Sequence, residues 1–218
     1  METMMRIPFA AFAMLAVATL LHPGHAAAQR KAEPGAFDYY LLSLSWSPAF
    51  CAREDRAGGS EQCGADKRFG WVVHGLWPQF ADGGYPRACA PGRSVPKAVV
   101  DETIGMMPDV GLILHEWRTH GTCSGLSPAD YFATLRAAAA KVMVPPALSA
   151  PKDGLSVPAS KVEAQFVEAN PGLTPDMIAV VCQRRTVSEV RVCLDKTLTP
   201  RACGKGIEDR CGKNGVLK

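Results

Sequence analysis

Two short motifs contain all the histidines that lie beyond the first 28 residues of this chain. The first motif is built around His74, and the second contains His115, Glu116 and His120. Histidine is the side chain whose ordinary pKa lets it gain and lose protons near neutral pH. Its concentration beside tryptophan, glutamate and glycine predicts a site of acid–base chemistry, rather than a set of satisfied core or surface residues.

The second motif has the composition of a helix, and we expect one over residues 112–120 that ends at Gly121. Glu116 and His120 are four residues apart, so a helix would place them on one face. A carboxylate beside an imidazole raises its basicity and orients its ring. If His74 from a neighbouring strand faces this pair, one histidine can accept a proton while the other donates one.

This division of roles is what cleavage of a phosphodiester by a neighbouring hydroxyl requires. One group takes the proton of the 2′-hydroxyl, and the other protonates the departing 5′-oxygen. The phosphorane between them carries extra negative charge, which cationic or hydrogen-bonding groups must stabilise. Trp77, or Tyr85 in the following loop, is placed to stack on a base, although aromatic residues at such positions also commonly pack in a core or loop.

A zinc protease is the alternative that shares part of the second motif. Its signature requires two histidines four residues apart on one helical face, whereas His115 and His120 are five apart. This spacing disfavours metal-dependent hydrolysis. We therefore expect neither a metal nor another cofactor.

The first 28 residues resemble a secretory signal peptide. Arg6 precedes an apolar run from Ile7 to Leu21, and the small residues Ala26, Ala27 and Ala28 offer a cleavage site. The run is short for a transmembrane helix, which needs about 20 residues, so we expect cleavage after Ala28, with an uncleaved anchor as the alternative. Residues 29–218 would then form one secreted or periplasmic domain, soluble, free of the membrane and monomeric.

All eight cysteines follow the predicted signal peptide. An even number in an exported chain implies disulfides, and the lack of any Cys-x-x-Cys pair disfavours structural zinc. The count alone does not determine the pairing. Proximity and order suggest the pairs Cys51–Cys63, Cys89–Cys123, Cys182–Cys211 and Cys193–Cys203. The formal net charge of +3 is compatible with an anionic substrate but is too small to identify one.

Strands and helices are interspersed along the chain without a regular βαβ rhythm. The apolar pattern predicts strands over residues 37–46, 69–76, 178–181 and 187–194, with Pro48 and Pro78 ending the first two and loops over 52–68 and 80–97. Further helices are expected from Ser127, as N-cap before Pro128, and from about Pro158 to Asn170. This order predicts an α+β fold with a mainly antiparallel central sheet, flanked by helices and joined by disulfides.

The two motifs resemble the active-site motifs of the ribonuclease T2 family, in the stretches His74-Gly75-Leu76-Trp77-Pro78 and His115-Glu116-Trp117…His120-Gly121-Thr122-Cys123. The similarity covers nearly all of residues 29–218. Residues 39–48 resemble the first strand of the family, and residues 190–203 resemble its C-terminal strand in the form of bacterial members. Both motifs, in order, with the cysteine count and the signal peptide, make the resemblance specific.

The resemblance implies a metal-independent endoribonuclease that acts on single-stranded RNA and not on DNA. It implies 2′,3′-cyclic phosphate products, which such enzymes often open to 3′-phosphates. By position in the motifs, it assigns these roles: His120 as general base, His74 as general acid, His115 as phosphate ligand, Glu116 as support for the transition state, and Trp77 and Tyr85 as the first base site.

Two positions depart from the family pattern. Thr119 stands where a lysine is usual, with Arg118 one place earlier, and Ser45 stands where many members carry glutamine, which predicts weaker contacts to the second base. Neither change alters the predicted proton-transfer pair. An active ribonuclease is therefore the favoured interpretation. The alternative is a degenerate member that binds RNA or another partner without cleaving it, and Thr119 is the feature that supports it.

Overall fold

The computed structural model of this chain describes Met1 and residues 32–54, 59–64, 66–92 and 94–218. Apart from Met1, the predicted signal peptide lies outside the described residues. In the part of the chain that is described, no helix is both long enough and apolar enough to cross a membrane.

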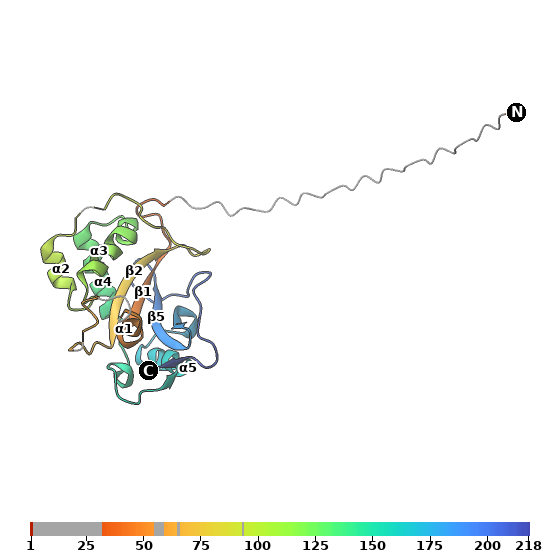
Figure 1. Cartoon of the computed structure of the whole chain (residues 1–218). Coiled ribbons are helices and arrows are strands. Elements are labelled where there is room, and N and C mark those ends of the chain that lie inside the picture. The colour runs from red at the N-terminus through yellow and green to blue at the C-terminus, as the bar shows by residue number, and fades with distance from the viewer. Residues whose placement is uncertain (2–31, 55–58, 65, 93) are drawn as a thin grey trace.

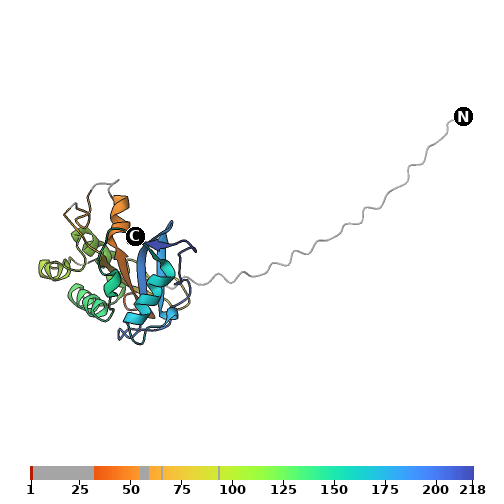
Figure 2. The ribbon, with the colours of Figure 1, turned by 90° about the horizontal axis from the view of Figure 1, so that it is seen from below.

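A mainly antiparallel sheet forms the centre of the fold, with helices on its flanks (Figure 1, Figure 2). Its strands are β1 (Tyr39–Trp46), β2 (Trp71–Gln79), β3 (Val157–Pro158), β4 (Ile178–Gln183), β5 (Thr186–Leu194) and β6 (Val216–Leu217). β1 pairs with β2 and β5, and β4 pairs with β5, all antiparallel. Among the described strands, β5 and β6 alone pair in parallel. The predicted α+β fold is confirmed.

The helices are α1 (Ser47–Glu54), α2 (Lys97–Thr103), α3 (Val110–Thr119), α4 (Pro128–Ala140) and α5 (Ala159–Ala169). Figure 1 shows α2, α3 and α4 grouped beside β2, whereas α5 lies with the C-terminal part of the chain. The helices α3, α4 and α5 occupy the segments where helices were predicted. Ser127 accepts a hydrogen bond from the backbone N–H of Asp130, which confirms its role as N-cap.

The two faces of β1 contact different clusters, because side chains alternate along a strand. One face packs into the main core with the helices, through Tyr40, Leu42, Leu44 and Trp46. The other face contributes Tyr39 and Leu41 to a smaller cluster, against which Trp77 and Ile207 pack. The second face therefore carries the residues around the candidate site, while the first anchors the sheet.

Prolines affected the first two strands differently. β1 ends at Trp46, before Pro48, as predicted. Pro48 lies in the first turn of helix α1, where proline is tolerated, and residues 52–54 belong to this helix instead of the expected loop. β2 continues through Pro78 to Gln79. It is an edge strand of the sheet, where the missing N–H of a proline need not break the ladder.

Helix α2 is a short helix that was not predicted: the expected loop over residues 80–97 ends at its first residue, and no element was expected over residues 98–103. It begins at Lys97 and buries only Val99 and Thr103. Seven residues give too few turns for a helical period to stand out from the sequence.

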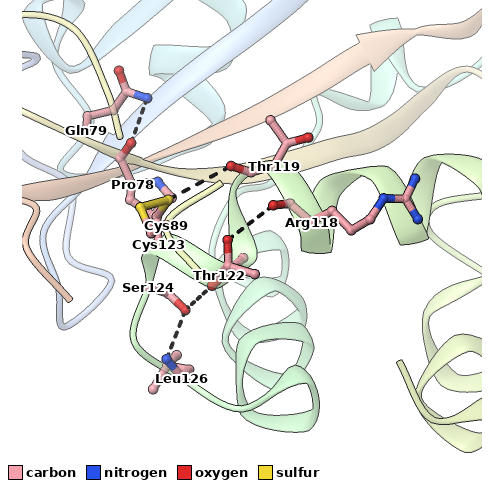
Figure 3. Close-up of a disulfide and its surroundings, with 10 residues drawn as sticks. Pro78, Gln79, Cys89, Arg118, Thr119, Thr122, Cys123, Ser124 and Leu126 are labelled. Carbon is pink, nitrogen blue, oxygen red and sulfur yellow. Dashed lines mark hydrogen bonds between the residues drawn. A yellow bond between two sulfur atoms is a disulfide. The ribbon is translucent and has the colours of Figure 1, made fainter. Parts of the chain in front are cut away.

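The structure contains four disulfides among the described residues, and they are the four pairs that proximity and order suggested: Cys51–Cys63, Cys89–Cys123, Cys182–Cys211 and Cys193–Cys203. Cys89–Cys123 joins the loop after β2 to the 3₁₀ turn that follows α3, as Figure 3 shows. The last two pairs fix the C-terminal segment to β4 and β5.

Candidate active site

Strand β2 and helix α3 bring the two histidine motifs together. His74 and Trp77 come from β2, and Glu116 comes from α3. The buried Glu116 carboxylate accepts a 2.7 Å hydrogen bond from Trp77 Nε1. Its other oxygen, Oε1, lies 3.8 Å from His74 Nε2. Glu116 is thus the group that joins the two motifs.

Gly75 permits this close approach of α3 to β2. A Cβ atom at Gly75 would lie 2.1 Å from Glu116 Oε2 and 2.4 Å from Trp77 Nε1. Any larger residue would displace the carboxylate, so this packing requires glycine at position 75 of the first motif.

His74 occupies a β-bulge in β2. On β1, Ser43 pairs with Gly75 and Leu44 pairs with Val73, so His74 has no opposing residue in the ladder. A bulge inserts an extra residue and redirects its side chain. The His74 side chain remains 32% exposed, which leaves it accessible to a substrate.

Trp77 contacts both histidines that were predicted to transfer protons. Its ring centroid lies 5.1 Å from that of His74 and 5.3 Å from that of His120. The ring of Tyr85, from the loop after β2, lies 5.8 Å from His120. Trp77, Tyr85 and His120 line a pocket of about 440 Å³, large enough to accept a nucleobase between aromatic side chains.

His120 is buried and neutral. Its Nδ1 has no hydrogen-bond partner in the described part of the chain. Burial, aided by the positive potential of His115, His74 and Arg87, lowers its pKa to about 3. The expectation that Glu116 raises the basicity of His120 is therefore wrong.

The geometry of the helix end explains this correction. α3 stops at Thr119, and His120 is its C-cap, with φ −117°. The imidazole of His120 packs against the rings of Trp77 and Tyr85, whereas the Glu116 carboxylate is engaged by Trp77 and faces His74. Spacing along an ideal helix does not anticipate this departure at its last residue.

Strand β5 supplies two site residues that sequence reasoning missed, Glu189 and Arg191. His74 Nδ1 donates a 3.2 Å hydrogen bond to Glu189 Oε1. Arg191 holds the other oxygen of that carboxylate, with N–O distances of 2.7 and 2.6 Å, and its guanidinium lies 5.3 Å from the Trp77 ring centroid. The sequence signal that could have identified them is their alternation with the buried Val190 and Val192, which places Glu189 and Arg191 on the same face of the strand.

Burial and the nearby charges shift the pKa values of His74, Glu116 and Glu189. Burial alone would lower the pKa of His74, but the hydrogen bond to Glu189 and the charges of Glu116 and Glu189 raise it above 6.5. Burial raises the pKa of Glu116 to about 7 despite His74 and Trp77. Burial also opposes ionisation of Glu189, yet His74 and Arg191 bring the pKa of that carboxyl down to about 2.

His115 lies apart from the buried cluster, exposed on α3. Its Nε2 lies 3.4 Å from Thr119 Oγ1, one turn along the helix. Burial and the nearby charge of Arg118 lower the pKa of His115. In Figure 3 the Arg118 side chain leaves the helix in a different direction from Thr119. Among the described residues, no group of three or more potential ligands is arranged to hold a metal ion.

Comparisons with known proteins agree with this architecture. Residues 37–203 match the Ribonuclease T2 family. A "Ribonuclease" of Aeromonas hydrophila is 47% identical over 105 residues, which are 48% of this chain and 46% of that protein. A "Probable ribonuclease" of Haemophilus influenzae is 40% identical over 108 residues, 44% of this chain and 40% of that protein. The chain thus matches a little under half the length of these curated relatives.

Solved structures share the fold. The RNase-related protein from Calystegia sepium superposes with a TM-score of 0.65 at 21% identity, over 84% of this chain and 98% of that one. RNase NT in complex with 5′-AMP gives a TM-score of 0.57 at 22% identity, over 80% of this chain and 98% of that one. Since the family match also spans most of the chain, including both histidine motifs and all strands of the central β1–β2–β5 unit, this protein belongs to the ribonuclease T2 family.

Proposed function

We propose that this protein is an endoribonuclease that cleaves single-stranded RNA without a metal, through a 2′,3′-cyclic phosphate. The observation that carries the proposal is the contrast between two histidines in contact with one tryptophan. His120 is buried with a pKa lowered to about 3, whereas His74 is held by Glu189 with a pKa raised above 6.5. One histidine is thus neutral and the other protonated in mildly acidic solution, as a base and an acid require.

In the first step, His120 accepts the proton of the ribose 2′-hydroxyl as the oxygen attacks phosphorus. The bond from phosphorus to the 5′-oxygen breaks, and His74 gives its Nε2 proton to that oxygen. The bound phosphodiester is an anion, so it raises the basicity of His120 when it binds. In the second step the roles reverse: His74 accepts a proton from water, the hydroxide opens the cyclic phosphate, and His120 returns its proton to the 2′-oxygen.

The other site residues bind the RNA and stabilise the phosphorane. Glu116 orients Trp77 through their 2.7 Å hydrogen bond, and its carboxyl group lies beside His74. From this position Glu116 supports the phosphorane. His115, on the exposed side of α3, is placed to hold a phosphate oxygen. Trp77 and Tyr85 form the first base site by stacking. Glu189 engages the N–H groups of Arg191. We therefore assign Arg191 the role of positioning the Glu189 carboxylate.

Digestion of RNA and of DNA of the same sequence, each in excess chelator, tests the proposal. The purified protein should degrade RNA and leave DNA intact, because the substrate's own 2′-hydroxyl is the nucleophile. Loss of activity in chelator, with recovery on adding a divalent metal, would refute it.

A protein that binds RNA without cleaving it is the second candidate, and Thr119 in place of a lysine is the observation that favours it. A neutral hydroxyl stabilises phosphorane charge less than an ammonium does. The same digestion separates the two: full-length RNA that is retained by the protein but never shortened would identify a binding protein.

We also propose that the protein is exported from the cytoplasm and is a monomer. Four disulfides favour an oxidising compartment, secreted or periplasmic. Cell fractionation tests the location, and light scattering of the purified domain, residues 29–218, tests the mass.

A further inference from the structure

The C-terminal loop, residues 203–211, forms one wall of the pocket beside His120. Lys205, Gly206, Ile207 and Arg210 line the pocket together with Trp77 and Tyr85. The family match ends at residue 203. These four lining residues therefore lie beyond the part of the chain that the family match covers.

Disulfides and backbone hydrogen bonds hold both ends of the loop. Cys193–Cys203 fixes its start to β5, and Cys182–Cys211 fixes its end to β4. Between them, the N–H of Lys205 donates to Ala81 and the N–H of Arg210 donates to Val180, at 3.0 and 2.9 Å. The backbone of a loop held in this way needs little further ordering when a ligand binds.

The wall is cationic. Lys205 and Arg210 are exposed, and none of the described residues that line the pocket is an aspartate or glutamate. The loop does contain Glu208 and Asp209, but neither lines the pocket, and Asp209 accepts a hydrogen bond from the Val180 N–H. Arg191 also lines the pocket, but Glu189 engages its N–H groups. The pocket thus combines aromatic rings for a base with two further cations, Lys205 and Arg210, for an anion.

We propose that Lys205 and Arg210 bind the 5′-phosphate of the nucleotide whose base occupies this pocket. The inference rests on the proposed function, in which His120 and His74 act on the 2′-hydroxyl and the 3′-phosphate of that nucleotide. Its 5′-phosphate is then the remaining anion, and the two cations on the same pocket are the groups that match it. The site would make the protein prefer an internal nucleotide of a chain to a 5′-terminal one.

Binding of two 2′-deoxy dinucleotides of equal charge tests the site, because neither can be cleaved through a 2′-hydroxyl. In both, the second nucleotide lacks a base, so only the first base can occupy the pocket; one carries an added 5′-phosphate and the other an added 3′-phosphate. By fluorescence anisotropy, the wild-type protein should bind the 5′-phosphorylated one about tenfold more tightly, as expected for a charge-assisted contact. The double variant K205A/R210A should lose this preference, and the control Lys213→Ala, at an exposed cation outside the pocket, should keep it.

Two outcomes would overturn the inference: equal binding of both dinucleotides by the wild type, or an unchanged preference in K205A/R210A. Lys205→Arg, which keeps the charge, should retain most of the preference and guards against loss through misfolding. These results are independent of cleavage. A protein that shows the preference but never cleaves RNA would refute the proposed function alone, and one that cleaves RNA without the preference would refute only this site.

Discussion

Glu189 Oε1 lies 3.2 Å from His74 Nδ1, and Arg191 binds the opposite oxygen of the same carboxylate. The carboxyl has a pKa of about 2, so it is ionised and can only accept this hydrogen bond. The bond fixes the proton of His74 on Nδ1, and the second proton of the cationic ring on Nε2, which faces Glu116. Glu189 is therefore a positioning residue for the predicted general acid.

Replacement of Glu189 by glutamine should shift the pH dependence of cleavage. The amide keeps an acceptor for His74 Nδ1 but loses the negative charge that raises the pKa of His74. The alkaline limb of kcat/KM should move to lower pH, so activity at pH 7 falls about tenfold while activity at pH 5 falls less. Glu168→Gln, at an exposed site on α5, is the matched control. An equal loss at every pH would contradict the positioning role.

The wild-type enzyme should be most active in mildly acidic solution. His120 must be neutral to accept a proton, and its pKa is lowered to about 3, so the base form is lost only as the pH falls towards 3. His74 must be protonated, and its pKa is raised above 6.5, so the acid form is lost as the pH rises through that higher value. A bell-shaped profile of kcat/KM should result. A flat profile from pH 4 to 8 would argue against this pair.

Alanine substitutions should separate the three histidines. His74→Ala and His120→Ala should each reduce kcat by at least about 10²-fold, the typical contribution of a general acid or base. His115→Ala should raise KM more than it lowers kcat, because its predicted role is to hold the phosphate. Steady-state kinetics on a dinucleotide substrate measure all three. Near-wild-type kcat in either of the first two variants would eliminate that histidine as a proton-transfer group.

Thr119→Lys should raise kcat several-fold with little change in KM. Thr119 is only partly buried and lies 3.4 Å from His115 Nε2, so a lysine there can place its charge near a phosphate held by His115. The gain should arise mainly in the transition state, where the phosphorane charge develops.

Arg118→Ala is the companion measurement for Thr119. The Arg118 side chain diverges from Thr119 (Figure 3), so its removal should change kcat little. If Thr119→Lys is neutral and Arg118→Ala is severely impaired, the arginine already supplies the cation, and the interpretation of Thr119 as a handicap is wrong.

The sequence predicted the parts of this protein whose signals are local. Ser127 and Pro128 begin α4 by capping chemistry, and the alternating apolar residues of β5 predicted a strand. Apart from the disulfides and the approach of His74 to the second motif, contacts between segments distant in sequence could not be predicted. Glu189 meets His74 only because β5 pairs with β1 and β1 pairs with β2 around the bulge at His74.

The error at Glu116 and His120 has the same origin. Their spacing suggested a pair on one helical face, but the helix ends one residue before His120. Trp77, from a strand distant in sequence, instead donates a hydrogen bond to the Glu116 carboxylate. Periodicity describes a regular helix, and this site uses the residue at which the helix stops.

An oligoribonucleotide with one 2′-deoxy nucleotide tests the central claim most directly. After digestion in chelator, mass spectrometry of the fragments should show cleavage at the other linkages, with 2′,3′-cyclic phosphate or 3′-phosphate ends. The linkage on the 3′ side of the deoxynucleotide should stay intact, because it lacks the hydroxyl that His120 would deprotonate. Cleavage at that linkage, or fragments that end in 5′-phosphates, would contradict the account.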